Sequence, residues 1–363
     1  MPNIIDYGKF ILTFDPENPQ SHFTDLGLTS VMAPESLLPG TIPWPAGSAP
    51  TGAPLATPPA ETDDLSKFKG YDAVVVTWTS AEAAALAKLL TPENPVSTWY
   101  EYRYNVNNYI PLVTGNNAPF NDSSKDMVRY YHSMGLYFPC KIGNAKVLLF
   151  KSGLHLDYDG PDIPVKKLMA EINQAVQPKI FITTGTGGAI GADVLLGDVI
   201  IAVDAKFDCT TQFKNETWHN AEYPTTPLPA TVLAAITPDL TKVNAARIPG
   251  ARPVPQMWTD AESIIVTTDF FGFDDSTDYY KLQGLGRVCD MGDAMVASAL
   301  QPFTGTRFFA IRNASNPQIP NPNNNIEDAK KQSAHIYSKY GALTTAASVI
   351  ATWAVIDTVI NKP

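Results

Sequence analysis

The chain has 363 residues, 44% of them hydrophobic, with a formal net charge of −10 and a pI near 5.0. This length and composition are enough for one large α/β domain or two smaller ones. The acidic balance, together with the lack of a lysine or arginine block with interleaved aromatics, argues against nucleic acid as a partner.

The first ten residues carry both acidic and basic side chains and no long apolar run, which is not typical of a signal peptide. Cys140, Cys209 and Cys289 are odd in number and widely spaced, a pattern that favours free thiols in a reducing compartment. We therefore expect a cytoplasmic protein. No zinc-ligand spacing is present, and neither a metal nor an organic cofactor is indicated.

Prolines recur through residues 32–59 together with Gly, Ala and Thr, a composition that forms neither a regular helix nor a central strand. This stretch is expected to be an extended arm, and the compact domain is expected to begin near Tyr71. The sequence thus predicts a Pro-rich N-terminal extension over residues 1–70 and one α/β domain over residues 71–363.

From residue 71 onward, short β-branched runs alternate with helical segments. Continuous apolar runs are typical of strands covered on both faces, so the sequence predicts a three-layer α/β sandwich. Residues 207–257 interrupt the alternation and are expected to be loop insertions near the active face, whereas the uncharged residues 340–356 favour a buried helix over a membrane span. Strands are expected at residues 73–77, 146–151, 179–184, 198–203, 263–267 and 307–311, and helices at residues 81–90, 165–176, 293–300 and 327–360.

Residues 183–202 read TTGTGGAIGADVLLGDVIIA, a Gly-rich stretch followed by an apolar strand. Gly185, Gly187, Gly188 and Gly191 are expected to form a turn in which positive φ angles bring backbone N–H groups close to an anion or a sugar. The alternative is that these glycines only turn the chain. Spacing excludes a dinucleotide fingerprint, and the absence of lysine between residues 179 and 206 excludes a P-loop.

This stretch is similar to the nucleoside phosphorylase and nucleosidase superfamily. There, a Thr/Ser-Gly-Ser/Thr-Gly-Gly turn precedes Gly-Asp-Val-Val-Ile-Ala, and residues 197–202 here read GDVIIA. The resemblance covers about residues 71–360. It implies a mixed central sheet flanked by helices, a nucleoside ligand, a homo-oligomeric assembly, and a sugar side lined by Thr186 with the Gly187 and Gly188 amides.

The resemblance also gives Glu82, at a strand-to-helix junction, the role of activating the water that attacks the sugar. A carboxylate can act in this way as a general base if burial raises its pKa. Thr79 and Glu82 also have the spacing of a capping box, in which the glutamate only holds a helix end.

Two further segments resemble ligand-binding parts of the family. In VTTDFFG, Phe271 would stack on the base, although a phenylalanine beside a strand is more often part of a core. In VCDMGDA, Met291 would pack on the sugar, while Gly292 replaces the glutamate that grips the ribose hydroxyls. Asp293 or Asp290 is then left as a shifted substitute, and Asp293 can equally complement a helix dipole.

Residues 312–316 resemble the Arg-x-x-Ser-Asp pattern whose aspartate protonates the departing purine. Asn316 holds the place of that aspartate and can hydrogen-bond a purine N7 or 6-oxo group, but it cannot release a proton. Arg312 and Ser315 would orient it, and the alternative is a turn before Pro317. His155, in a segment weakly similar to trimeric purine nucleoside phosphorylases, would touch the sugar or the nucleophile, although a structural role is more common.

Two arginines hold phosphate in the phosphorylases of this superfamily, and here Thr183 takes the place of one, while no arginine lies between residues 71 and 101. The sequence therefore predicts a nucleosidase that hydrolyses the N-glycosidic bond of a purine nucleoside or related compound. The alternatives are a phosphorolytic enzyme that binds phosphate, and a non-catalytic nucleoside-binding or storage protein, because Gly292 and Asn316 replace two family carboxylates.

Overall fold

Two fully buried parallel strands, β2 (Ala73–Thr77) and β6 (Ile180–Ala189), form the centre of the fold. In this computed structural model the described residues are 7–16, 18–19, 42–113, 132–156, 163–236, 248 and 250–362. Within them, one sheet runs in the order β1-β4-β5-β2-β6-β12-β11-β8-β9, and β3, β7, β10 and β13 pair beside this path. The sheet contains both parallel and antiparallel pairs, so it is mixed, as the resemblance implied.

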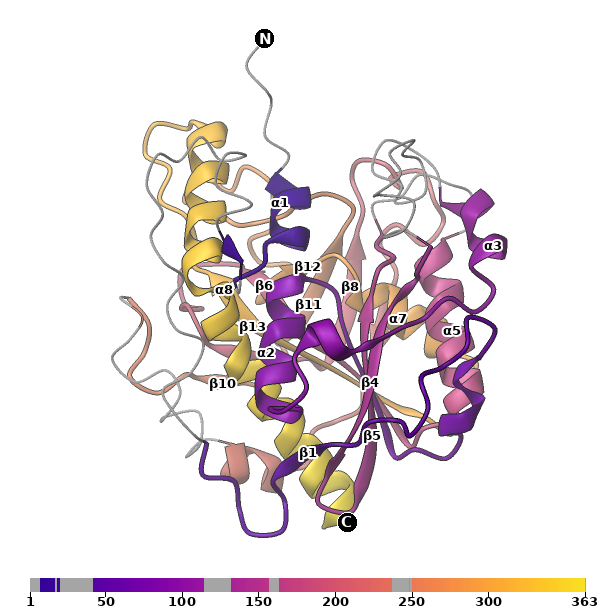
Figure 1. Ribbon diagram of the computed structural model, residues 1–363. Coiled ribbons are helices and arrows are strands. Elements are labelled where there is room, and N and C mark those ends of the chain that lie inside the picture. Colours follow the sequence, from indigo (N-terminus) through magenta and orange to yellow (C-terminus); the bar gives the residue numbers. More distant parts are fainter. Residues whose placement is uncertain are drawn as a thin grey trace.

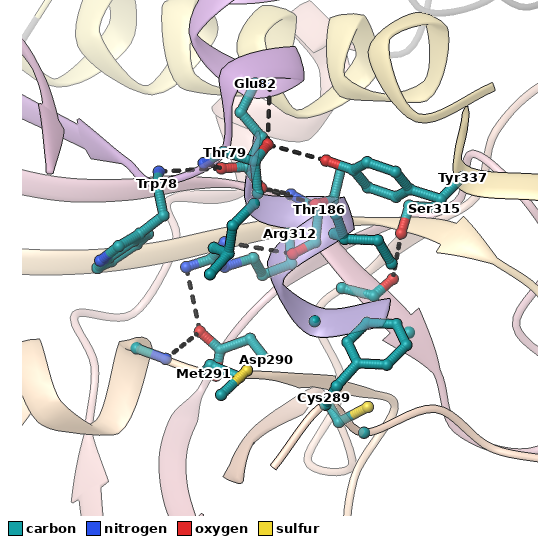
Figure 2. A pocket seen from close by; sticks show the side chains of 18 of the residues that line it. Trp78, Thr79, Glu82, Thr186, Cys289, Asp290, Met291, Arg312, Ser315 and Tyr337 are labelled. Atoms are coloured by element: carbon teal, nitrogen blue, oxygen red, sulfur yellow. Dashed lines mark hydrogen bonds and ion pairs between the residues drawn. The ribbon is translucent and has the colours of Figure 1, made fainter. Parts of the chain in front are cut away.

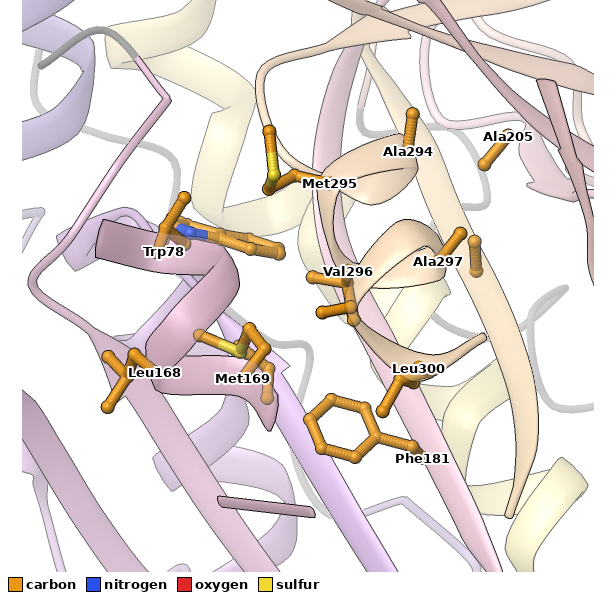
Figure 3. Close-up of a cluster of buried hydrophobic side chains, with 14 of the residues drawn as sticks. Trp78, Leu168, Met169, Phe181, Ala205, Ala294, Met295, Val296, Ala297 and Leu300 are labelled. Carbon is orange, nitrogen blue, oxygen red and sulfur yellow. The ribbon is translucent and has the colours of Figure 1, made fainter. Parts of the chain in front are cut away.

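Helices cover both faces of the sheet, with α2 and α8 on one side and α5 and α7 on the other (Figure 1). The apolar run of β2 explains why, because successive side chains of a strand point to opposite faces. Val74 and Val76 pack in the cluster with α5 and α7, which Figure 3 shows in part, whereas Ala73 and Val75 pack in the cluster with α2 and α8. The three-layer α/β sandwich is confirmed. The helices are α1 (Tyr7–Thr13), α2 (Ser80–Leu90), α3 (Val106–Tyr109), α5 (Pro164–Val176), α7 (Asp293–Leu300) and α8 (Ile326–Ile356).

Each expected strand and helix is present, some with shifted ends, and the structure adds strands that the sequence did not indicate. The expected strands correspond to β2, β5 (Ala145–Ser152), β6, β7 (Val199–Ile201), β11 (Ile264–Thr268) and β13 (Arg307–Asn316). The added strands are β1 (Pro50–Gly52), β3 (Tyr100–Glu101), β4 (Gly135–Ile142), β8 (Asp204–Asp208), β9 (Glu222–Pro224), β10 (Met257–Trp258) and β12 (Val288–Asp290).

The Gly-rich stretch is not a turn. β6 continues through Gly185, Gly187 and Gly188 because β13 pairs with it on one side and β12 joins it antiparallel on the other. A Cβ atom on Gly187 would lie 2.4 Å from Cγ2 of Val288 and 2.7 Å from the carbonyl oxygen of Cys289, so the glycine permits this close strand contact. The turn comes later, at Gly191, where φ is 82°.

Two other expectations need correction. Part of the stretch expected to be loop insertions is sheet, since β8 and β9 pair antiparallel, and Trp218 packs on Phe207 with ring centroids 4.8 Å apart. Part of the Pro-rich arm is also sheet, because β1 pairs antiparallel with β4. Residues 32–41, 237–247 and 249 of these stretches lie outside the described residues.

α8 and its short continuation are long and apolar enough to cross a membrane, but most of the apolar stretch is buried inside the fold. Hydroxyl side chains on its buried side join it to the sheet. Thr352 Oγ1 donates to Thr184 Oγ1 at 2.9 Å, and Ser348 Oγ donates to Asn313 Oδ1 at 2.8 Å. The packing therefore agrees with the buried helix that the composition favoured.

Replacing Gly187 with alanine should destabilise the fold, because the new methyl group would overlap Val288 and the β12 backbone. Overpacking of this kind costs roughly 1–3 kcal/mol. Urea denaturation of Gly187→Ala measures the loss, and Gly305→Ala is the control, since a Cβ there meets nothing within 4 Å. Equal stability of the two variants would contradict the packing described.

Candidate active site

A cavity lies where β2 and β13 end, beside the second half of β6 (Figure 2). It brings together Glu82, Thr186, Phe271 and Asn316, which are far apart in the sequence. Ligands of open α/β sheets bind at the carboxyl ends of parallel strands, which is where β2 and β13 deliver their last residues. The sequence-predicted site residues that line this cavity are Glu82, His155, Thr186, Gly187, Gly188, Phe271, Met291, Arg312, Ser315 and Asn316.

Glu82 lies in the first turn of α2, and its carboxylate accepts five hydrogen bonds. Oε2 accepts from Thr77 Oγ1 at 2.6 Å, from Trp78 N at 3.0 Å and from Thr79 N at 2.9 Å. Oε1 accepts from the backbone N–H and the hydroxyl of Thr186 at 2.6 and 2.7 Å. The capping box is complete, and the same carboxylate also lines the cavity, so the structural reading of Glu82 does not exclude the functional one.

The pKa of Glu82 is lowered, so the condition for a general base, a pKa raised by burial, is not met. Burial does act upward, but the Arg312 charge and the hydrogen bonds from Thr186 and Thr77 outweigh it. Arg312 Nη1 lies 3.7 Å from Glu82 Oε1. Gly185 makes room for this arrangement, since a Cβ there would lie 2.4 Å from the Glu82 carboxyl carbon. Glu82 is thus a buried, ionised carboxylate at neutral pH.

Asp293 lies behind the cavity and does not line it, so the structure does not place it as a sugar ligand. It is the first residue of α7, and its carboxylate faces the Arg312 guanidinium. Arg312 Nε donates to Asp293 Oδ2 at 2.8 Å and Nη2 donates to Oδ1 at 2.5 Å. This two-pronged geometry is the strongest form of an arginine–carboxylate pair, and it fixes the position of the Arg312 guanidinium.

Asp290 is the carboxylate of this segment that lines the cavity. It accepts from Thr267 Oγ1 at 2.6 Å and from the backbone N–H groups of Gly292 and Asp293 at 3.0 and 2.8 Å. Arg312 Nη2 lies 3.1 Å from its Oδ2. Burial and the neighbouring Asp293 charge raise the pKa of Asp290 to about 7.

Asn316 ends β13, so it belongs to a strand and not to the turn that was its alternative. Its Oδ1 accepts from Ser315 Oγ at 3.2 Å, and Ser315 Oγ also donates to the Gly187 carbonyl oxygen at 3.2 Å. Its buried Nδ2 has no hydrogen-bond partner among the described residues. A donor is therefore free in the cavity, which the half-buried Phe271 also lines.

His155 also lines the cavity, and it lies on the segment that follows β5. Burial and the charge of Lys151, near the end of β5, lower its pKa to about 3. The imidazole is therefore neutral at physiological pH and serves as a hydrogen-bonding group, not as a cation. Residues 157–160 of the segment that suggested His155 lie outside the described residues.

Comparison with known families agrees with the fold. Residues 117–347, more than half of the chain, match the model of a family described as the phosphorylase superfamily. The chain belongs to the phosphorylase superfamily. A search of curated protein sequences finds no match.

Several solved structures are similar to this superfamily member. A mutant of the Helicobacter pylori MTAN with 5′-methylthioadenosine in its active site is 13% identical, with a TM-score of 0.47 over 79% of this chain and 99% of that one. A futalosine hydrolase of Helicobacter pylori is 11% identical, with a TM-score of 0.47 over 79% and 97%. A 5′-methylthioadenosine/S-adenosylhomocysteine nucleosidase from Colwellia psychrerythraea, in complex with adenine, is 15% identical, with a TM-score of 0.48 over 79% and 95%.

Several cavity residues of this phosphorylase superfamily member escaped the sequence reasoning. Trp78 stands between β2 and α2, in the strand-to-helix junction that precedes Glu82, yet nothing in its spacing distinguishes it from a core residue. Tyr337 comes from α8 and its hydroxyl lies 2.8 Å from Thr79 Oγ1, whereas Ile11 and Leu12 come from α1, before the expected start of the domain. Cys289 contributes a buried thiol, and burial raises its pKa to about 12. All three cysteines are free and buried.

The raised pKa of Asp290 predicts a pH dependence of stability. An aspartate titrates near pH 4 in the unfolded chain, so the folded protein binds more protons than the unfolded one between about pH 4 and 7. The raised pKa of Asp290 contributes its full amount to the free energy of unfolding below about pH 4. This contribution decreases as the pH rises and is lost above about pH 7. The free energy of unfolding is measured by urea denaturation at pH 5 and pH 8 for wild type and for Asp290→Asn. Between these two pH values, wild type should lose at least about 1.4 kcal/mol more than the variant, since each pKa unit is worth that amount. A constant difference between the two proteins would contradict the raised pKa.

Proposed function

We propose that the protein cleaves the N-glycosidic bond of a purine nucleoside or related compound by hydrolysis. The observation that carries the proposal is the convergence in one cavity of an ionised carboxylate, a half-buried aromatic ring and a free amide donor, from Glu82, Phe271 and Asn316. Phe271 would stack on the base, and Met291 with Thr186 and the Gly187 and Gly188 amides would line the sugar.

The charge of Glu82 suits a reaction in which the bond to the base breaks early and the sugar becomes an oxocarbenium-like cation. A fixed negative charge in a site with little water stabilises such a cation strongly. Water then adds its oxygen to the anomeric carbon, the base keeps the electron pair of the broken bond, and the proton lost by the water passes to solvent or to the base. Because the pKa of Glu82 is lowered, Glu82 would mainly stabilise the sugar cation by its charge and orient the attacking water.

Thr186 has a particular part in this mechanism. A carboxylate offers about four lone-pair positions, and five donors already share those of Glu82. Four of them are backbone N–H groups or the tightly placed Thr77 hydroxyl. The Thr186 hydroxyl can rotate toward the ligand and leave Oε1 open for the attacking water, while the Thr186 backbone N–H stays in place.

The absence of an unpaired cationic side chain among the described residues that line the cavity favours water over phosphate as the nucleophile. Arg312 faces three carboxylates, those of Glu82, Asp290 and Asp293, so its charge is already balanced. A phosphate dianion would meet Glu82 and Asp290 with no arginine left to receive it. Phosphorolysis remains the alternative reaction and would need charge from elsewhere, such as Lys151 or a second subunit. Homo-oligomeric assembly and cytoplasmic location stay predictions from the sequence.

Incubation with a panel of purine nucleosides, with and without phosphate, tests the reaction. We expect free base and free sugar in equal amounts, at a rate that added phosphate does not raise. Chromatography separates base, sugar and sugar 1-phosphate. Formation of the sugar phosphate only when phosphate is present would establish phosphorolysis, and tight nucleoside binding with no cleavage would establish the non-catalytic alternative.

Glu82→Gln removes the charge from the centre of the site, and turnover should fall at least about 100-fold, the usual scale for a carboxylate that acts on the reacting atoms. Glu93→Gln is the control, because Glu93 is exposed in the turn after α2 and does not line the cavity. Circular dichroism confirms that both variants are folded. Unchanged turnover in folded Glu82→Gln would refute its role.

Asn316→Asp tests how the base is recognised. Asn316 is proposed to hydrogen-bond a 6-oxo group or N7 without giving up a proton, so wild type should prefer 6-oxopurine nucleosides. An aspartate can be protonated and can donate that proton to the leaving base, so the variant should shift kcat/KM toward 6-aminopurine nucleosides, by about tenfold or more. A preference that stays the same in wild type and variant would count against contact between residue 316 and the base.

A further inference from the structure

Tyr337 links α8 to the start of α2, where Glu82 lies. Its side chain is 2% exposed and lines the cavity, and its hydroxyl oxygen lies 2.8 Å from Thr79 Oγ1. Thr79 donates its backbone N–H to Glu82 Oε2 at 2.9 Å, and its Oγ1 accepts from the Glu82 N–H at 3.1 Å. Figure 2 shows the hydroxyl end of Tyr337 directed toward this group. The phenol therefore ends one hydrogen bond away from a residue that holds Glu82.

The Thr186 side chain connects the same phenol to the other oxygen of the carboxylate. Burial and the Glu82 charge raise the pKa of Tyr337, whereas hydrogen bonds from the Thr79 and Thr186 side chains act in the opposite direction. The Thr186 hydroxyl also donates to Glu82 Oε1 at 2.7 Å. Two acceptors, the carboxylate and the phenol oxygen, are thus within its reach. Since a hydroxyl has one proton, it can donate fully to only one of them at a time.

A water molecule can be oriented by Glu82 only if one lone-pair position of the carboxylate is open. Oε1 has about two such positions, and the Thr186 N–H and hydroxyl take both. Oε2 already accepts three hydrogen bonds, from Thr77, Trp78 and Thr79. An incoming water must therefore displace a donor. The Thr186 hydroxyl can leave without moving the backbone, because the phenol oxygen gives it a second acceptor.

We propose that Tyr337 receives the Thr186 hydroxyl when the attacking water binds to Glu82. The hydroxyl turns from Oε1 to the phenol oxygen, and the water donates one of its protons to the position on Oε1 that becomes free. Without the phenol, the same turn would leave a buried hydroxyl with no acceptor, which is unfavourable. Tyr337 is thus a positioning residue that acts through Thr186. This inference rests on the proposed function and deepens it, because it states how a fully bonded Glu82 becomes able to orient water.

A double-mutant cycle on the full chain tests the inference, with kcat and KM measured for the purine nucleoside that wild type hydrolyses fastest. Tyr337→Phe keeps the buried ring and removes the acceptor, so kcat should fall about tenfold, the scale of one hydrogen bond, while KM changes less than about twofold. Thr186→Val removes the hydroxyl but keeps the backbone N–H that bonds to Oε1. In that background Tyr337→Phe should change kcat less than about twofold, because the phenol has no hydroxyl to receive.

Thr186→Ser keeps a hydroxyl at this position, so the loss caused by Tyr337→Phe should return in that background. If Thr186→Val does not fold, Thr186→Ala takes its place in the cycle. Tyr109→Phe is the matched control, because Tyr109 is also buried, its hydroxyl donates to Glu171 Oε2 at 2.7 Å, and it does not line the cavity. It should leave kcat and KM unchanged. Circular dichroism confirms that each variant is folded.

Two results would overturn the inference while leaving hydrolysis intact. One is a loss of kcat on Tyr337→Phe that is as large in Thr186→Val as in wild type, since the phenol would then act independently of the Thr186 hydroxyl. The other is no loss in either background. If wild type hydrolyses none of the nucleosides, the proposed function fails and the inference fails with it.

Discussion

The buried Arg312 guanidinium is the interaction on which the site depends. It extends from β13 and meets Asp293 on α7, Asp290 at the end of β12 and Glu82 on α2, and all four side chains are almost fully buried. Burying an ion costs several kcal/mol unless opposite charges and hydrogen bonds compensate for it. Here one cation compensates three carboxylates that come from separate parts of the chain. These elements must therefore pack together for the buried charges to be balanced.

The Arg312 charge is shared among three carboxylates, and the pKa values of Glu82 and Asp290 shift in opposite directions. Glu82 receives five hydrogen bonds besides the Arg312 charge, and its pKa falls despite burial. Asp290 is buried and lies beside Asp293, which holds the guanidinium more tightly, so burial and the Asp293 charge raise its pKa. Two carboxylates of one cavity are thereby driven toward different protonation states, an arrangement by which enzymes assign different tasks to chemically similar groups.

Local patterns in the sequence were sufficient for much of the fold, whereas the residues that converge in the cavity were taken from the resemblance to the superfamily. β2 and α7 have the expected bounds, because continuous apolar runs and helix starts are local signals. The Gly-rich stretch was misread as a turn because its strand character depends on β12, which joins it from a distant part of the chain. The sequence left Asp293 and Asp290 as alternatives, since it does not show that Arg312 faces Asp293 or that Asp290 lines the cavity.

Trp78 and Gly292 show how a departure from a family pattern is linked by packing to a residue that is distant in the sequence. Taken alone, the glycine at 292 reads as the loss of a ribose-binding carboxylate. In the structure, the volume next to that glycine is filled by an indole from another element, and an acceptor two residues before it faces the cavity. Packing density allows either a side chain at 292 or the indole, because protein interiors leave no room for both. The residue at position 292 and the indole at position 78 therefore depend on one another, although they lie far apart in the sequence.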